Sequence, residues 1–312
     1  SINSNKDAQI YGHLQAQTGV SLQTQQQIRL GNKIQAGKSI ELQGGKGADT
    51  NLGNDLSAYK DNGLVMLGSA SLETTGENRR IYLNAPGKIS ILASKGNSGP
   101  DYGIDASKQG SKVIIGSKTG QNGKVYIARK IRSYQTMEIN SSKSASGKDM
   151  VLDYSGALET INGSISLNPS SGSIKGDLIA KGQGSAITVS GDEQLEIEGK
   201  LQAAGDITID SENKGILIAD SDKGTGRVLS TGSGGTIEIE AGNDLRLHGE
   251  VKARENASLK KVRLKSESGK IAQGENGNII THSAPVILQA NKLDLEGTLE
   301  TNQAQSGSNK DQ

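Results

Sequence analysis

The sequence predicts an all-β fold, a right-handed parallel β-helix of about eleven to twelve turns with three short strands in each turn. A five-residue pattern recurs along the chain: a small or polar residue, any residue, an aliphatic residue, any residue, and then Ala, Thr or Ser. Residues 199–203, Gly-Lys-Leu-Gln-Ala, are one copy. Two aliphatic, polar, aliphatic triplets precede most copies, which is the alternation of strands with one buried face.

The spacing of the copies also favours a solenoid. The interval is 20 residues from Leu14 to Ile34, from Leu158 to Leu178 and from Val251 to Ile271, and it is longer elsewhere. A recurring minimum with variable additions is typical of a fixed repeat that carries loop insertions. The aliphatic residues at the centre of the pattern are expected at Leu14, Ile34, Leu72, Ile104, Ile131, Leu158, Leu178, Leu201, Val228, Val251, Ile271 and Leu299.

The two triplets of each turn can be followed along most of the chain. Those ahead of Leu201 are 187–189 and 195–197, and those ahead of Val228 are 207–209 and 216–218. Because equivalent strands recur in the same phase, we expect like strands to stack on like and to form three parallel sheets around one tube. Further triplets are predicted at 20–22, 28–30, 40–42, 64–66, 81–83, 89–91, 113–115, 125–127, 165–167, 237–239, 245–247, 262–264, 286–288 and 293–295.

The composition suits a narrow core. The chain has 312 residues, of which 32% are hydrophobic, with seven Tyr and no Phe or Trp. Such a chain cannot fill a wide globular interior, but stacked turns bury their aliphatic residues against one another. The 42 Gly residues are also compatible with disorder, against which the regular alternation argues. We predict one domain over residues 1–312, with a polar tail at about 302–312, in a segment of a longer chain.

Charge and cysteine content exclude several classes of function. Lys and Arg number 35 against 34 Asp and Glu, a net charge of +1, and the two signs are interspersed. A nucleic-acid partner is not expected, because no basic stripe follows a phosphate backbone. No apolar run approaches the roughly 20 residues that span a bilayer. The absence of cysteine excludes disulfides and thiolate chemistry.

The insertions are the candidate sites of interaction, because loops on a rigid scaffold often carry function. The largest covers 43–63, and others cover 93–103, 141–149, 219–226 and 272–285. The candidate interaction residues in the first two insertions are Lys46, Asp55, Tyr59, Asp61, Asp101 and Tyr102.

Metal and modification signals are weak. Residues 44–49, Gly-Gly-Lys-Gly-Ala-Asp, are similar to the calcium-binding repeat of parallel β-rolls, with Asp49 as the candidate ligand. The motif occurs once, whereas such sites need tandem copies, so we predict no metal and no cofactor. The sequons at Asn140, Asn162 and Asn256 leave glycosylation open.

The repeats resemble the shaft of filamentous-haemagglutinin-type exoproteins, the adhesins of bacterial two-partner secretion. Residues 12–16 (Gly-His-Leu-Gln-Ala), 204–209 (Ala-Gly-Asp-Ile-Thr-Ile) and 241–247 (Ala-Gly-Asn-Asp-Leu-Arg-Leu) carry the resemblance. It implies a right-handed β-helix, export through an outer-membrane partner, a place outside the cell or on its surface, and a host or bacterial receptor or glycan as ligand. The N-terminal secretion domain of that family is not recognisable in the chain.

Three functions remain open. The first is a structural or adhesive fibre segment that serves in adhesion, biofilm or effector display without catalysis. The second is a carbohydrate-active β-helix enzyme of lyase or hydrolase type, in which stacking brings Glu196, Glu238 and Arg246 together. The third is an inert scaffold that carries a toxin. The chain has no recognisable catalytic motif. Because neither terminal segment contains a capping helix, we favour the first, with continuation or end-to-end self-association.

Overall fold

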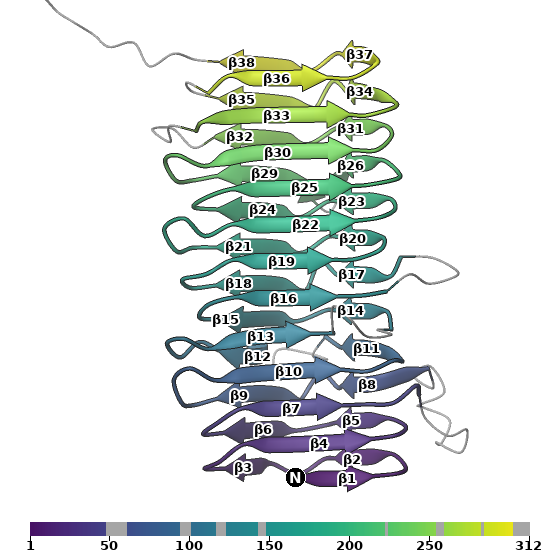
Figure 1. Cartoon of the computed structure of the whole chain (residues 1–312), viewed down its shortest axis with the longest axis vertical. Coiled ribbons are helices and arrows are strands. Elements are labelled where there is room, and N and C mark those ends of the chain that lie inside the picture. The colour runs from purple at the N-terminus through teal and green to yellow at the C-terminus, as the bar shows by residue number, and fades with distance from the viewer. Residues whose placement is uncertain are drawn as a thin grey trace, which may run out of the picture.

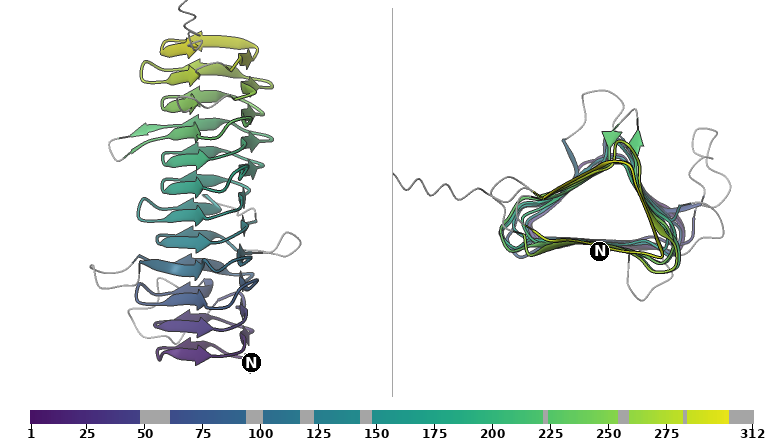
Figure 2. Two further views of the ribbon diagram at one scale, coloured as in Figure 1. Left: turned by 90° about the vertical axis from the view of Figure 1, so that its left-hand side faces the viewer. Right: turned by 90° about the horizontal axis from the view of Figure 1, so that it is seen from above.

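The computed structural model describes residues 1–47, 61–93, 101–116, 123–142, 148–221, 224–253, 259–281 and 284–301. The chain winds through three parallel sheets of twelve strands each (Figure 1). In the same view the strands of the front sheet run to the right, and the chain returns to the left behind them as it rises. The winding is therefore right-handed. Seen from above, the tube is triangular (Figure 2), and the predicted β-helix is confirmed.

Each turn contributes one strand to each sheet, in the order first, second, third. The first sheet contains β1 (Ile2–Ser4), β4 (Val20–Thr24), β7 (Ile40–Gln43), β10 (Arg80–Asn84), β13 (Lys112–Ile115), β16 (Met137–Asn140), β19 (Ile165–Asn168), β22 (Ile187–Gly191), β25 (Ile207–Ser211), β30 (Thr236–Ala241), β33 (Lys261–Ser266) and β36 (Val286–Gln289).

The second sheet contains β2 (Ala8–Ile10), β5 (Ile28–Leu30), β8 (Asn62–Met66), β11 (Lys88–Ile91), β14 (Val125–Ile127), β17 (Met150–Leu152), β20 (Gly172–Ile174), β23 (Leu195–Ile197), β26 (Ile216–Ile218), β31 (Leu245–Leu247), β34 (Lys270–Gln273) and β37 (Lys292–Leu295).

The third sheet contains β3 (Leu14–Ala16), β6 (Lys33–Ala36), β9 (Ser71–Thr74), β12 (Tyr102–Ala106), β15 (Lys130–Ser133), β18 (Ala157–Thr160), β21 (Asp177–Ala180), β24 (Lys200–Ala203), β29 (Arg227–Ser230), β32 (Glu250–Ala253), β35 (Asn278–Thr281) and β38 (Thr298–Thr301). A short antiparallel pair, β27 (Asp220–Ser221) and β28 (Gly224–Thr225), projects from the corner between the second and third sheets (Figure 2).

The predicted register is confirmed in the middle of the tube. Ile187, Ile207 and Ile237 are consecutive partners in the first sheet, and Leu201 pairs with Leu178 and Val228 in the third. These side chains point inward and are fully buried. Because each one contacts its equivalents in the turns on either side, the narrow tube has a continuous aliphatic core.

One predicted position is wrong. Ile271 lies in the second sheet, between Leu245 and Leu293, and the third-sheet residue of that turn is Ile279. The five-residue pattern placed Ile271 in the wrong sheet because the next inward-facing residue of its strand, residue 273, is a glutamine. Gln273 is buried, and its Nε2 donates to the carbonyl oxygens of Gly277 at 2.7 Å and of Thr298 at 2.8 Å. The backbone therefore satisfies a polar residue where an aliphatic one was expected.

The fifth residue of the pattern is small because it faces inward at a corner. Ser133, Thr160, Ser230 and Thr281 are fully buried there. Their hydroxyls donate to carbonyl oxygens of the adjoining bends; Ser230 Oγ, for example, lies 3.2 Å from Gly205 O. A small hydroxyl residue fills this space and also satisfies a carbonyl that turns away from the sheet.

Glycine at the first position of the pattern is required by backbone contact between turns. A Cβ on Gly199 would lie 2.1 Å from the carbonyl oxygen of Gly176, and a Cβ on Gly249 would lie 2.2 Å from that of Gly226. Neither residue has a positive φ, so close approach and not backbone conformation explains the choice. Gly156, Gly176, Gly199, Gly226 and Gly249 form what we call the glycine column, at the corner between the second and third sheets.

The last described turn leaves inward aliphatic residues uncovered. Leu293, Leu295 and Leu299 are 46%, 44% and 49% exposed, and Ile2 in the first turn is 49% exposed. Each terminal strand pairs on one side alone within the described sheets. The predicted polar tail, 302–312, lies outside the described residues. Within the ranges given above, no helix is long and apolar enough to cross a membrane.

We expect Gly199→Ala to destabilise the protein by about 1 to 3 kcal/mol, because the added methyl group would press against the neighbouring turn. Gly12→Ala is the matched control, since Gly12 has the same place in the pattern and a Cβ added to it would meet no atom within 4 Å. Urea unfolding of both variants measures the difference. Equal stability of the two variants would contradict the stacking argument.

Candidate functional site

The predicted interaction residues do not converge on one site. Lys46 and Asp61 are exposed near the corner that leads into β8 of the second sheet. Asp101 is exposed directly before β12 of the third sheet, and Tyr102 is the first residue of that strand. Asp55 and Tyr59 lie outside the described residues, as does Asp49, the candidate calcium ligand.

Tyr102 belongs to a strand and not to the predicted loop. The guanidinium carbon of Arg132 lies 4.1 Å from the centre of the Tyr102 ring, and Arg132 Nη2 lies 2.8 Å from Asp105 Oδ2. Burial alone would raise the pKa of Asp105, but hydrogen bonds from Arg132 and Ser107 outweigh it and hold that pKa below its usual value. Tyr102 is therefore part of a fixed polar cluster on the third sheet.

Two of the three glycosylation sequons can be placed. Asn140 is buried, and its Nδ2 donates to Glu138 at 3.0 Å while its Oδ1 accepts from Asn168 at 2.9 Å. This amide is engaged and inaccessible to a glycosylating enzyme. Asn162 is exposed in a bend, and Asn256 lies outside the described residues.

The expected cluster of Glu196, Glu238 and Arg246 is wrong. Glu196 and Arg246 lie in the second sheet two strands apart, with Leu217 between them. Glu238 lies in the first sheet. Within the described ranges, no group of three or more His, Asp or Glu side chains could hold a metal ion.

A hollow of the surface lies elsewhere. Two adjoining depressions, of 520 and 510 Å³, share Lys200 and Arg227. The first follows the corner between the second and third sheets, and the second continues over the outer face of the third sheet. We call the two together the corner groove. It extends from Lys130 in β15 to Lys252 in β32.

The glycine column explains why the surface is hollow there. Gly156, Gly176 and Gly199 line the first depression, and they add no side chains to it. Longer side chains rise on either side. Lys200 and Arg227 come from the first positions of β24 and β29, and Tyr154 comes from the bend before β18.

A fixed cluster lines the first depression of the corner groove. Glu198 is 6% exposed, its Oε1 lies 3.0 Å from Lys175 Nζ, and its Oε2 accepts a hydrogen bond from the Tyr154 hydroxyl. Lys175 Nζ also lies 5.2 Å from the centre of the Tyr154 ring. The hydrogen bond to Glu198 raises the pKa of Lys175. The three side chains thus hold one another in position.

Acidic and basic groups are unequally satisfied along the corner groove. Asp177 Oδ1 accepts from the backbone N–H of Lys200 at 3.1 Å, and Glu250 pairs with Arg227 Nε at 3.6 Å and with Lys252 Nζ at 3.7 Å. Neither Lys130 nor the side chain of Lys200 forms an ion pair with any residue that the structure describes. The carboxylates of the corner groove therefore have partners within the protein, whereas cations such as Lys130 and Lys200 are available to a ligand.

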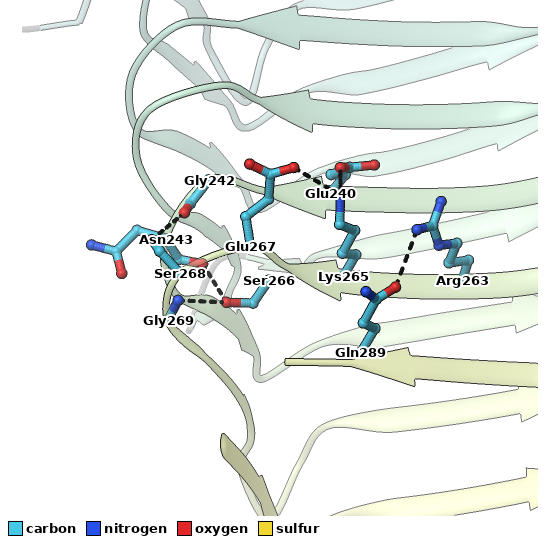
Figure 3. A network of polar contacts seen from close by, with 10 residues as sticks. All are labelled: Glu240, Gly242, Asn243, Arg263, Lys265, Ser266, Glu267, Ser268, Gly269 and Gln289. Atoms are coloured by element: carbon cyan, nitrogen blue, oxygen red, sulfur yellow. Dashed lines mark hydrogen bonds and ion pairs between the residues drawn. The ribbon is translucent and has the colours of Figure 1, made fainter. Parts of the chain in front are cut away.

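A second polar cluster lies on the first sheet near the C-terminal end (Figure 3). Lys265 stands between two carboxylates, Glu240 on the preceding strand and Glu267, whose Oε1 lies 2.7 Å from Lys265 Nζ. Hydrogen bonds to both carboxylates raise the pKa of Lys265 and lower that of Glu267. Lys265 thereby offsets part of the repulsion between the carboxylates of Glu240 and Glu267.

Asp210 lies beside this cluster and has no such partner cation among the residues that the structure describes. It pairs in register with Glu240 on the next strand. Partial burial and the nearby charge of Glu240 raise the pKa of Asp210 above its usual value. The ionised carboxylate is therefore unfavourable in the folded state.

We found no family model, curated protein or solved structure that matches the chain. The function is therefore inferred from the fold, its uncovered last turn and the corner groove.

Asp210→Asn should raise the stability of the protein at pH 7 and leave it unchanged near pH 3. A carboxyl group whose pKa is raised in the folded state contributes most to the free energy of unfolding when it is protonated. That contribution to stability is lost as the pH rises through the pKa of the group in the folded state. Urea unfolding of both proteins between pH 3 and 7 measures the effect.

Glu275→Gln is the control, because Glu275 is exposed in a bend between β34 and β35. A stability gain for Asp210→Asn that is the same at every pH would show that charge at this position is not the cause.

Proposed function

We propose that the protein is a structural and adhesive β-helical segment that extends and presents surface outside a bacterial cell. Twelve turns at about 4.8 Å each give a shaft on the order of 50 to 60 Å long. Its inward residues are aliphatic and its outward residues are largely polar or charged. Such a shaft suits a spacer or a fibre better than it suits an enclosed catalytic site.

The uncovered last turn is the observation that carries this proposal. Leu293, Leu295 and Leu299 occupy inward positions that continue the core, yet each is nearly half exposed. The backbone of β36, β37 and β38 also pairs on one side alone within the described sheets. A further turn stacked on this end, from the same chain or a second copy, would bury the aliphatic residues and complete the sheets.

The cellular setting follows from the resemblance to filamentous-haemagglutinin-type exoproteins. It supports export through an outer-membrane barrel partner and a place on the cell surface, where the segment would contact a receptor or a glycan. The described residues contain no membrane-spanning helix.

The corner groove favours one alternative, a carbohydrate-active enzyme, because Tyr154, Asp177 and Glu198 line it. General acid and base catalysis needs carboxylates that can exchange protons. Glu198 is engaged by Lys175 and Tyr154, and Glu250 by Arg227 and Lys252. This pairing fits binding better than proton transfer, and the non-catalytic function remains our proposal.

Sedimentation tests the structural function. We expect the 312-residue chain to form larger species as its concentration rises, because stacking covers the uncovered aliphatic residues. Leu299→Lys should prevent association, since it places a charge on the stacking surface. Ile287→Lys is the control: Ile287 is 43% exposed and lies on the outer face of β36. A wild-type chain that stays monomeric throughout would contradict self-association.

A cleavage assay tests the alternative. Incubation with neutral and acidic polysaccharides should release no new reducing ends and no unsaturated sugars, because Glu198 and Glu250 are held in ion pairs. Cleavage that Glu198→Gln abolishes while the fold persists would establish the enzyme instead.

A further inference from the structure

We propose that the corner groove binds an extended acidic polysaccharide, a polymer of sugars that carries spaced carboxylates. The inference rests on the proposed presenting function, for which it names the chemical class of the ligand. All the residues that it uses lie within one chain and within the described ranges.

The shape of the groove suits a linear polymer. It crosses β15, β18, β21, β24, β29 and β32 without leaving the corner and the outer face of the third sheet. Five steps between stacked strands correspond to about 24 Å. The groove is open along its length, so that a chain longer than the groove can lie in it and continue beyond both ends.

The cations are placed to meet carboxylates. Lys130 and Lys200 lie three strands apart, or about 14 Å, at equivalent positions of the third sheet. Arg227 follows one strand later, and its side chain is 57% exposed. It contacts Glu250 through Nε at 3.6 Å, and more than half of its side chain remains exposed to solvent. A guanidinium group that is accessible in this way binds carboxylates well.

The remaining groups of the groove suit sugar rings and hydroxyls. The Tyr154 ring is held by Lys175 and Glu198, so little freedom is lost when a ligand packs on it. Leu229 supplies an apolar surface in the second depression, and Gln202 and Thr231 supply hydrogen-bonding groups beside it. An apolar surface with a few polar groups is the usual composition of a ligand site.

The carboxylates of the groove argue against a densely charged ligand. Asp177 and Glu250 lie among the cations and would repel a polymer with a charge at every unit, such as a nucleic acid or a highly sulfated glycan. A polysaccharide with fewer charges can place its carboxylates at the cations and donate its hydroxyls to Asp177 or Glu250. The mixture of positive and negative side chains in the groove therefore favours a ligand with few charges and many hydroxyl groups.

Calorimetric titration of the 312-residue protein tests the inference with three probes: hyaluronate, which carries a carboxylate on alternate sugars, dextran, which is neutral, and heparin, which is densely sulfated. The groove variant is Lys200→Gln with Arg227→Gln. The charge-matched control is Lys108→Gln with Lys112→Gln, because both of those lysines are exposed where the chain enters β13 of the first sheet, away from the groove. Circular dichroism confirms that each variant keeps its fold.

We expect hyaluronate to bind, the groove variant to bind it about tenfold or more weakly, and the control to match the wild type. Dextran should not bind, and heparin should bind more weakly than hyaluronate. No binding of hyaluronate, or equal losses in both variants, would overturn the groove as the site. Tighter binding of heparin would overturn the ligand class. These outcomes are independent of sedimentation, since a monomer keeps the whole groove.

Discussion

The close stacking of each turn on the next is the constraint on which the rest of the structure depends. Strands in a parallel sheet lie about 4.8 Å apart, and the corners must keep that spacing as well as the strands do. The glycine column permits this, because any Cβ on Gly199 would collide with the carbonyl of Gly176. Small residues such as Ser230 permit it at the next corner. Aliphatic residues such as Ile207 can fill the core only because the corners allow the turns to approach.

The same constraint creates the corner groove. Stacking uses the inward faces and the backbone, so the outward side chains are free to vary. Where the glycine column reaches the surface, there is a strip without side chains, and Lys200, Arg227 and Tyr154 rise around it. The hollow therefore arises largely from the residues that stabilise the tube. The residues along its edges determine its chemistry.

Sequence patterns predicted the fold well and the site poorly, for physical reasons. Strand alternation and the central aliphatic residues reflect local burial, which recurs in every turn. The error at Ile271 arose because Gln273 is satisfied by backbone carbonyls in an aliphatic position. The corner groove joins residues from six turns, and variable insertions hide their alignment. One signal was present: Lys130, Lys200 and Arg227 each directly precede the central aliphatic residue of a pattern copy.

The proposed binding groove is parallel to the direction in which the shaft would be extended. The corner groove runs along the axis of the tube, and the open turns also lie on that axis. The row of charged residues at the first strand position ends at Glu250, since the next two residues in register, Asn278 and Thr298, carry no charge. If copies stack end to end, one groove would recur on each shaft length, on the order of 50 to 60 Å. A long polysaccharide could then occupy several grooves at once, and weak binding at each would add to strong attachment.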